Sequence, residues 1–95
     1  MKRSKEDIMR VSSVFRALSN PVRVRILLLI DETKRPLHIK ALADALKMDY
    51  AAVYRHVKIL QVNRLVKVYE VGRSRVISLK NFELLNQIME IAKKI

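Results

Sequence analysis

The chain has 95 residues, a length that suits one domain and leaves no room for a second core. With 51% hydrophobic residues, one Gly and two Pro, its composition excludes a disordered chain and a turn-rich β protein. The absence of cysteine excludes disulfides, thiolate metal sites and cysteine catalysis. Twenty Lys and Arg against nine Asp and Glu give a formal net charge of +11, which predicts a polyanionic partner.

Two helices are predicted at the start of the chain. The first covers residues 5–18, because Ser4 and the acid three residues later have the form of a capping box. Its apolar stripe consists of Ile8, Val11, Phe15 and Leu18. The second helix covers residues 21–31, with Asn20 as its cap and Pro21 at its first position. It is apolar nearly all round, so we expect it to be buried on most sides, with Arg23 and Arg25 as the exceptions.

A tight pair of helices is predicted in the middle of the chain. Residues 37–39 form either a short strand or the entry to a helix over residues 39–46. The next helix is expected to be capped by Asp49 and to end at Asn63, a residue that tolerates left-handed backbone. Its inner stripe consists of Val53, Val57 and Leu60. Two helices joined so closely, over residues 39–63, make a helix-turn-helix.

The outer face of the second helix in this pair has an unusual composition for a solvated surface. It carries Tyr50, Ala51, Tyr54, Arg55 and Lys58. Two phenol rings and two cations suit a surface that meets the phosphates and base edges of a duplex. We therefore interpret this segment as a DNA-recognition helix, with an ordinary solvated helix as the alternative.

Residues 65–79 are predicted to form a β-hairpin. β-branched residues are frequent on both sides of Gly72, which is the single glycine of the chain and marks the turn. A basic hairpin after a recognition helix is a wing, and we expect Arg73 and Arg75 to reach phosphate or the minor groove. The alternative is that these charges protect an edge strand and keep the hairpin soluble.

A final amphipathic helix is predicted over residues 81–94, with Asn81 as its cap. Long apolar stripes on both terminal helices of so small a chain favour a subunit interface over a purely intramolecular core. The residues expected near that interface are Ile8, Val11, Phe15, Phe82, Leu85, Met89 and Ala92.

Three blocks of the sequence resemble the ArsR/SmtB-type winged-helix repressors. Residues 15–27 (FRALSNPVRVRIL) match the family signature ALsdPtRlrIL, residues 42–46 (LADAL) match LAeaL, and residues 53–60 (VYRHVKIL) match vSrHLkvL. The resemblance covers roughly residues 8–80. It implies a homodimer whose first and last helices pair across the twofold, with the two recognition helices in successive major grooves.

The chain also departs from this family at the ends of two helices and on the recognition face. Lys47 and Arg64 stand where the family usually has Gly, which predicts either strained turns or a turn made by Asn63. Tyr50 and Tyr54 replace small polar residues that commonly face the bases.

No metal site is expected, and neither histidine has an obvious ligand partner. The cysteine motif of the family's namesakes is absent, and the last helix offers only two glutamates seven residues apart. We expect His56 to be a hydrogen-bonded structural residue and His38 to begin a helix.

These features predict one mainly α domain over residues 1–95 with a small β-hairpin (α+β), a winged helix-turn-helix with terminal dimerisation helices. We expect a homodimeric, metal-independent regulator of transcription that binds specific double-stranded DNA, most simply as a repressor. Phosphate contacts are expected from Lys40, Lys58 and the wing, and base contacts from Tyr50, Ala51, Tyr54 and Arg55.

Other functions are weighed against this one. A chromatin-like architectural protein of low sequence specificity also fits the charge of +11, and a winged helix used for protein contacts fits the fold. No Gly-rich phosphate loop or His-rich metal spacing supports an enzyme, and no cofactor is expected. The longest apolar run, residues 26–30, is too short for a membrane span, and no signal peptide is evident. We therefore expect a cytoplasmic, nucleoid-associated protein whose effector is left open.

Overall fold

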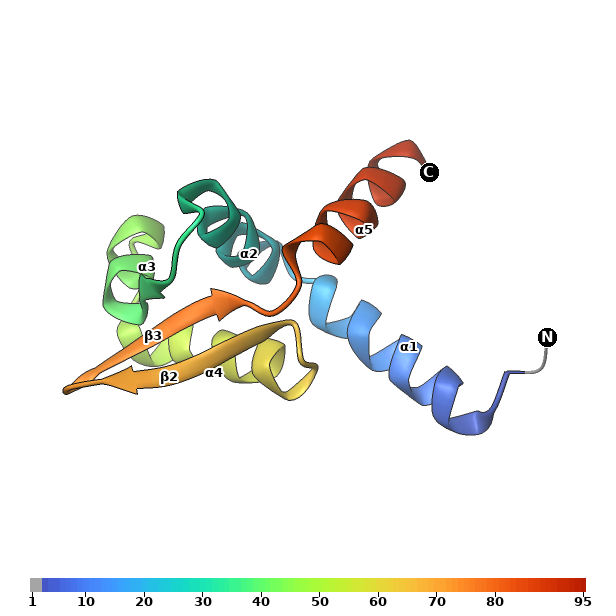
Figure 1. The fold of residues 1–95 in the computed structure, drawn as a ribbon, viewed down its shortest axis with the longest axis horizontal. Helices are drawn as coiled ribbons and strands as arrows, with labels where there is room; N and C mark the ends of the chain where they lie inside the picture. The colour runs from blue at the N-terminus through green and yellow to red at the C-terminus, as the bar shows by residue number, and fades with distance from the viewer. Residues whose placement is uncertain (1–2) are drawn as a thin grey trace.

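The computed structural model describes residues 3–95. The elements run in the order α1 (Lys5–Leu18), α2 (Pro21–Thr33), β1 (Leu37–His38), α3 (Ile39–Leu46), α4 (Tyr50–Val62), β2 (Val66–Val71), β3 (Ser74–Leu79) and α5 (Phe82–Lys94). Figure 1 shows α2, α3 and α4 gathered against the sheet, while α1 and α5 project on the side opposite the tip of the β2–β3 hairpin. The predicted α+β winged helix-turn-helix is confirmed.

Three helices begin at the caps that the sequence predicts. The Ser4 hydroxyl accepts a hydrogen bond from the Asp7 amide, and the Asp7 carboxylate accepts one from the Ser4 amide. The Asn20 side chain accepts from the amides of Val22 and Arg23, and Asn81 caps α5 in the same way. These bonds satisfy amides that have no partner inside the helix.

The predicted cap at Asp49 is wrong in one respect. Asp49 occupies the N-cap position of α4 with extended backbone, but its side chain makes no capping hydrogen bond. The Asp49 carbonyl still accepts the first intrahelical bond, from the Val53 amide at 3.0 Å. The start of α4 is therefore held by its backbone and its packing rather than by a side-chain cap.

The ends of α3 and α4 have left-handed turns without glycine. Lys47 and Arg64 have φ angles of 54° and 59°. After α4, the Leu65 amide bonds to the Leu60 carbonyl at 3.0 Å and the Arg64 amide to the Gln61 carbonyl at 2.9 Å, which is a Schellman arrangement. Asn63 itself has a φ of −87°, so the strained turn predicted as one of two solutions is the one adopted.

The sheet has three antiparallel strands in the order β1-β3-β2. The short strand that was one of two predictions for residues 37–39 exists, because Leu37 pairs with Ile77 and His38 with Val76. The hairpin pairs Val66–Val71 with Ser74–Leu79, and Gly72 makes its turn with a φ of 62°. Pairing with β1 attaches the wing to the start of α3.

The core lies between α2, α3, α4 and one face of the sheet. Its fully buried side chains are Ile26, Leu27, Ile39, Leu42, Val53, Val57, Leu60 and Ile77. The prediction that α2 is buried on most sides is too broad, because Leu28 is 39% exposed in addition to Arg25, which was expected to face solvent. The helix therefore has one polar and partly open side, even though its sequence is apolar nearly all round.

The terminal helices expose much of their apolar surface. Ile8, Phe15 and Phe82 are 57%, 62% and 57% exposed. Leu85 differs from them, because it is buried in the core of its own chain. Among residues 3–95, no helix combines the length and the apolar character that crossing a bilayer requires.

Candidate nucleic-acid interface

The recognition helix α4 presents its predicted outer face to solvent. Its inner side chains Val53, Val57 and Leu60 are completely buried, which fixes the rotation of the helix about its axis. Ala51, Arg55 and Lys58 are consequently exposed, and Tyr50 and Tyr54 lie on the same side with their rings stacked. The two ring centroids are 6.2 Å apart with an interplanar angle of 25°.

The wing folds back onto this face through one arginine. Arg75 on β3 donates from Nη1 to the Tyr50 hydroxyl at 3.3 Å, and its guanidinium carbon lies 4.5 Å from the centre of the Tyr54 ring. The hydrogen bond to Tyr50 raises the pKa of Arg75 above its ordinary value. Lys58 approaches the Tyr54 ring as well, with Nζ 5.7 Å from the centroid. The Tyr54 ring is therefore in contact range of two cations, Arg75 and Lys58.

A polar hollow of about 320 Å³ lies where the starts of α3 and α4 meet the wing. Its lining residues are His38, Lys40, Tyr50, Arg73, Ser74 and Arg75. The structure thus brings four residues predicted from separate segments, Lys40, Tyr50, Arg73 and Arg75, around one electropositive depression. His38 and Ser74 were not predicted to belong to this surface, since only the pairing of β1 with β3 brings His38 beside the wing.

An arginine on α2 connects the recognition helix to α1. Arg23 donates from Nε to the Ala17 carbonyl at 2.6 Å and from Nη2 to the Arg16 carbonyl at 3.2 Å. Its Nη1 lies 3.2 Å from Nδ1 of His56 on the inner side of α4. The prediction of a hydrogen-bonded, structural His56 is confirmed, but its partner was not predicted.

Burial of the His56 ring, together with the charges of Arg23 and Arg55, lowers its pKa below the ordinary value of 6.5. Since arginine is only a donor, the Nδ1 atom that faces Arg23 must be the unprotonated acceptor nitrogen. The neutral ring is the form that fits this contact.

Asn63 makes a second connection between α4 and α1. It is the one buried polar residue of the described chain, and its amide nitrogen donates to the Ile59 carbonyl at 2.9 Å. Its side-chain oxygen accepts a hydrogen bond from the Ser13 hydroxyl of α1. The C-terminal end of the recognition helix is therefore attached directly to the first terminal helix.

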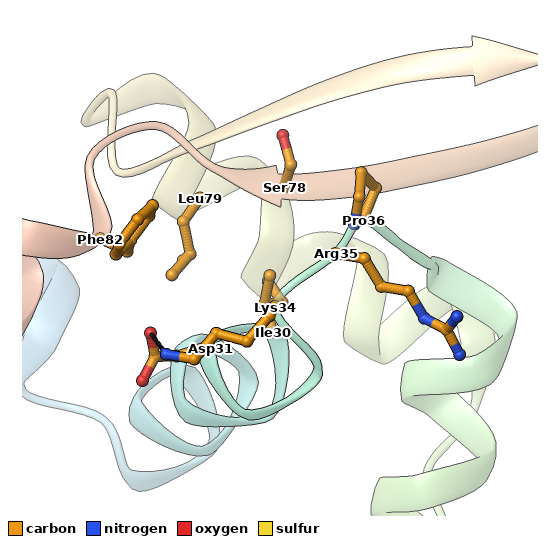
Figure 2. Close-up of a pocket in the computed structure, with 8 residues that line it drawn as sticks. All are labelled: Ile30, Asp31, Lys34, Arg35, Pro36, Ser78, Leu79 and Phe82. Atoms are coloured by element: carbon orange, nitrogen blue, oxygen red, sulfur yellow. Dashed lines mark hydrogen bonds and ion pairs between the residues drawn. The ribbon is translucent and has the colours of Figure 1, made fainter.

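A separate cavity of about 250 Å³ lies at the junction of α2, β3 and α5, away from the α4 face. Figure 2 shows Ile30, Leu79 and Phe82 around its apolar part, while Arg35 points away from it. At its edge, Lys34 pairs with Asp31 at 3.3 Å and lies 5.8 Å from the centre of the Phe82 ring. These contacts attach the start of α5 to the winged core.

The predicted interface residues fall into two groups. Ile8, Val11, Phe15, Phe82 and Ala92 are exposed in the single chain, so a second subunit has access to them. Leu85 is 4% exposed and Met89 packs against the core, so both mainly hold α5 to its own chain. Within residues 3–95 no three His, Asp or Glu side chains gather in a way that would hold a metal ion.

The fold and the exposed helix define a winged helix-turn-helix protein, and comparison with known proteins gives its family. A sequence profile described as a helix-turn-helix domain matches residues 18–69. A transcriptional repressor SmtB homolog from Synechocystis sp. is 32% identical over 89 residues, which cover 94% of this chain and 66% of that protein. The chain therefore belongs to the helix-turn-helix family, and within it to the ArsR/SmtB type of winged-helix regulators, which are not enzymes.

Solved structures share the whole architecture at low sequence identity. A possible transcriptional regulatory protein from Mycobacterium bovis (fragment 1–100) superposes with a TM-score of 0.83 at 21% identity, covering 96% of this chain and 99% of that one. The solution structure of the same fragment, described as a homodimeric winged helix-turn-helix DNA-binding domain, gives 0.82 at 20% identity, covering 99% and 91%. HlyU from Vibrio cholerae gives 0.77 at 18% identity, covering 95% and 96%. At such identities the likeness confirms the fold alone.

Proposed function

We propose that this chain is a homodimeric transcriptional regulator that binds specific double-stranded DNA and acts as a repressor without a bound metal. The observation that carries the proposal is the α4 face, where stacked Tyr50 and Tyr54 and exposed Arg55 adjoin an electropositive hollow of the wing. Aromatic rings beside cations on the exposed side of a recognition helix suit base edges flanked by phosphates. A duplex in the major-groove mode would meet all of these residues at once.

The contacts divide by their chemistry. Lys40, Lys58 and Arg73 are exposed cations at the margins of the face, and we assign them to phosphates, which supply affinity and salt dependence. Tyr50, Ala51, Tyr54 and Arg55 lie along the first two turns of α4 and are assigned to base edges. Arg75 is within the same surface, although its guanidinium already contacts both tyrosines.

The dimer is supported by the exposed apolar residues of α1 and α5, and by the Mycobacterium bovis fragment, which is described as homodimeric. The Synechocystis relative is described as a repressor, which is why repression is proposed in preference to activation. Such a regulator would act in the cytoplasm, on nucleoid DNA. An architectural protein that coats DNA with little sequence preference is the second candidate, because a net charge of +11 per chain supports that role too.

One experiment separates these functions. Binding of the purified chain to selected and to random duplexes is measured over a salt series. A preference of ~10³ or more for the selected sequence supports the regulator, and near-equal affinities support the coat protein. Negligible binding to any duplex would instead favour a winged helix used for protein contacts.

A second titration of the protein–DNA complex tests metal independence. Zinc is added to the protein–DNA complex, and the affinity should stay unchanged, because residues 3–95 contain no cluster of His, Asp and Glu suited to a metal. A shift of tenfold or more, equivalent to about 1.4 kcal/mol of coupling, would contradict this part of the proposal.

A further inference from the structure

The Tyr50 hydroxyl on α4 is hydrogen-bonded to the wing. Tyr50 is the first residue of α4, and the residue is 37% exposed on the recognition face. Arg75 of β3 donates a hydrogen bond to its oxygen at 3.3 Å. A guanidinium has five donors and no acceptor, so in this pair the Tyr50 oxygen can only accept.

This contact leaves the hydroxyl proton free and gives it a direction. Among the hydrogen bonds of residues 3–95, the bond from Arg75 is the one that the Tyr50 hydroxyl makes. A phenol proton lies close to the plane of the ring, so an arginine on one side of the oxygen directs the proton to the other side. Accepting a bond from a cation also polarises the O–H group and makes it a better donor.

The positions of both side chains are held by further contacts. The Tyr50 ring stacks on Tyr54, and the Arg75 guanidinium lies 4.5 Å from the centre of that second ring. Arg75 is anchored in the paired part of the wing, where it lies opposite Glu70 of β2. The group of Tyr50, Tyr54 and Arg75 therefore joins the recognition helix to the wing before any DNA is bound.

We propose that Tyr50, oriented by Arg75, is a specificity-determining donor that reads a hydrogen-bond acceptor on a base edge and excludes cytosine at that position. In the major groove, purines present N7 and thymine presents O4 as acceptors, whereas cytosine presents only the N4 amino donor. A donor facing that amino group would leave two donors opposed and unpaired. Arg75 is then a positioning residue, which acts on the base through Tyr50.

The inference rests on the proposed function, since it requires that α4 enter the major groove. The competing assignment is that the Tyr50 hydroxyl donates to a phosphate oxygen, which is also an acceptor. The two differ in one measurable respect. A base contact changes preference at one position of the half-site, and a phosphate contact weakens all sequences alike.

The test measures relative affinities for duplexes that carry each of the four bases at every position of the half-site. Tyr50→Phe, which removes only the hydroxyl, should reduce the discrimination against cytosine by about tenfold at one position. Arg75→Ala should reduce discrimination at the same position, and Arg75→Lys should restore part of it. The double variant Tyr50→Phe/Arg75→Ala should lose no more discrimination than Tyr50→Phe alone, because both changes affect one contact.

The matched control is Arg73→Ala, which removes an exposed wing cation that makes no bond to Tyr50. It should weaken all sequences evenly and lower the salt slope by about one unit. A uniform loss in Tyr50→Phe, or base preferences that remain intact in Tyr50→Phe or in Arg75→Ala, would overturn the inference while leaving the proposed function standing. If the wild-type chain binds no duplex, the proposed function and this inference are both contradicted. Thermal unfolding of each variant verifies that these changes on the protein surface leave the fold intact.

Discussion

The winged core and the two terminal helices of this chain differ in how far their apolar side chains are buried. From α2 to β3, apolar side chains close over one another, and eight large residues are fully buried. Along α1 and α5, in contrast, large apolar side chains such as Ile8, Phe15 and Phe82 remain more than half exposed. The core is therefore closed within one chain, whereas both terminal helices leave apolar surface exposed, as the proposed dimer requires.

The two regions are nevertheless connected at the recognition helix. Arg23 binds the end of α1 and His56 of α4, and the Ser13 hydroxyl of α1 bonds to Asn63 at the end of α4. The position of α4 thus depends on the helix that is expected to pair across the twofold. Half-site spacing would then be set by the dimer and transmitted through these few polar contacts.

The largest effect is expected from placing a charge on the exposed stripe. Phe15→Glu should give monomers, because a carboxylate would be buried without a partner in the interface. DNA affinity should fall by ~10²-fold or more, since the two half-sites would no longer be bound together. Light scattering should give a mass of one 11.1 kDa chain at micromolar concentration for the variant and twice that for the wild type.

The control for that prediction is a substitution on the inner side of α5. Leu85→Ala should lower the free energy of unfolding by ~2–5 kcal/mol, because it leaves a cavity in the core of the chain itself. Its oligomeric state under native conditions should stay dimeric. If the wild-type chain is monomeric, or if the Phe15→Glu variant remains dimeric, the exposed stripe of α1 is not the dimer interface.

A smaller effect is expected from protonating His56, which contacts Arg23 where the winged core meets α1. The pKa of His56 is lowered in the fold, so the neutral ring is favoured there. Its contribution to stability is therefore fully present above the unfolded value of about 6.5 and is lost as the pH falls through the folded pKa. Below this range, a protonated ring would place a donor and a charge against Arg23.

The comparison is with His56→Gln, whose amide oxygen still accepts from arginine but does not titrate. Between about pH 7.5 and about pH 5, the wild type should lose more free energy of unfolding than the variant, with a difference in proton uptake of at most about one proton. Equal pH dependence in the two proteins would show that the Arg23–His56 contact does not depend on protonation.

The smallest effect concerns the strained turn after α4. Arg64→Gly should raise the free energy of unfolding by ~0.5–1 kcal/mol, because the φ of 59° is unfavourable for any residue with a Cβ atom. Arg64→Ala keeps that strain and removes the same charge, so it should not stabilise the protein. Chemical denaturation of the two variants at one protein concentration measures the difference, and equal stabilities would mean that the turn is not strained.

Most of the fold is determined by local patterns in the sequence. Ser4, Asn20 and Asn81 cap their helices as predicted, and the stripe of Val53, Val57 and Leu60 gives α4 its correct inner face. These predictions succeed because capping bonds and helical periodicity involve residues only a few positions apart. The outer face of α4 follows from the same periodicity, once the inner face is known.

Tertiary structure alone decides which distant residues meet. Arg75 was predicted to reach toward DNA, but the antiparallel pairing of the wing brings it onto Tyr50, 25 residues earlier in the chain. His56 was predicted to be structural, and only the packing of α2 against α4 supplies Arg23 as its partner. Leu85 and Phe82 share one predicted stripe, yet one is buried and the other exposed, because α5 meets the core along only part of that stripe. Sequence periodicity specifies a face of a helix, whereas the angle at which neighbouring elements pack determines what that face contacts.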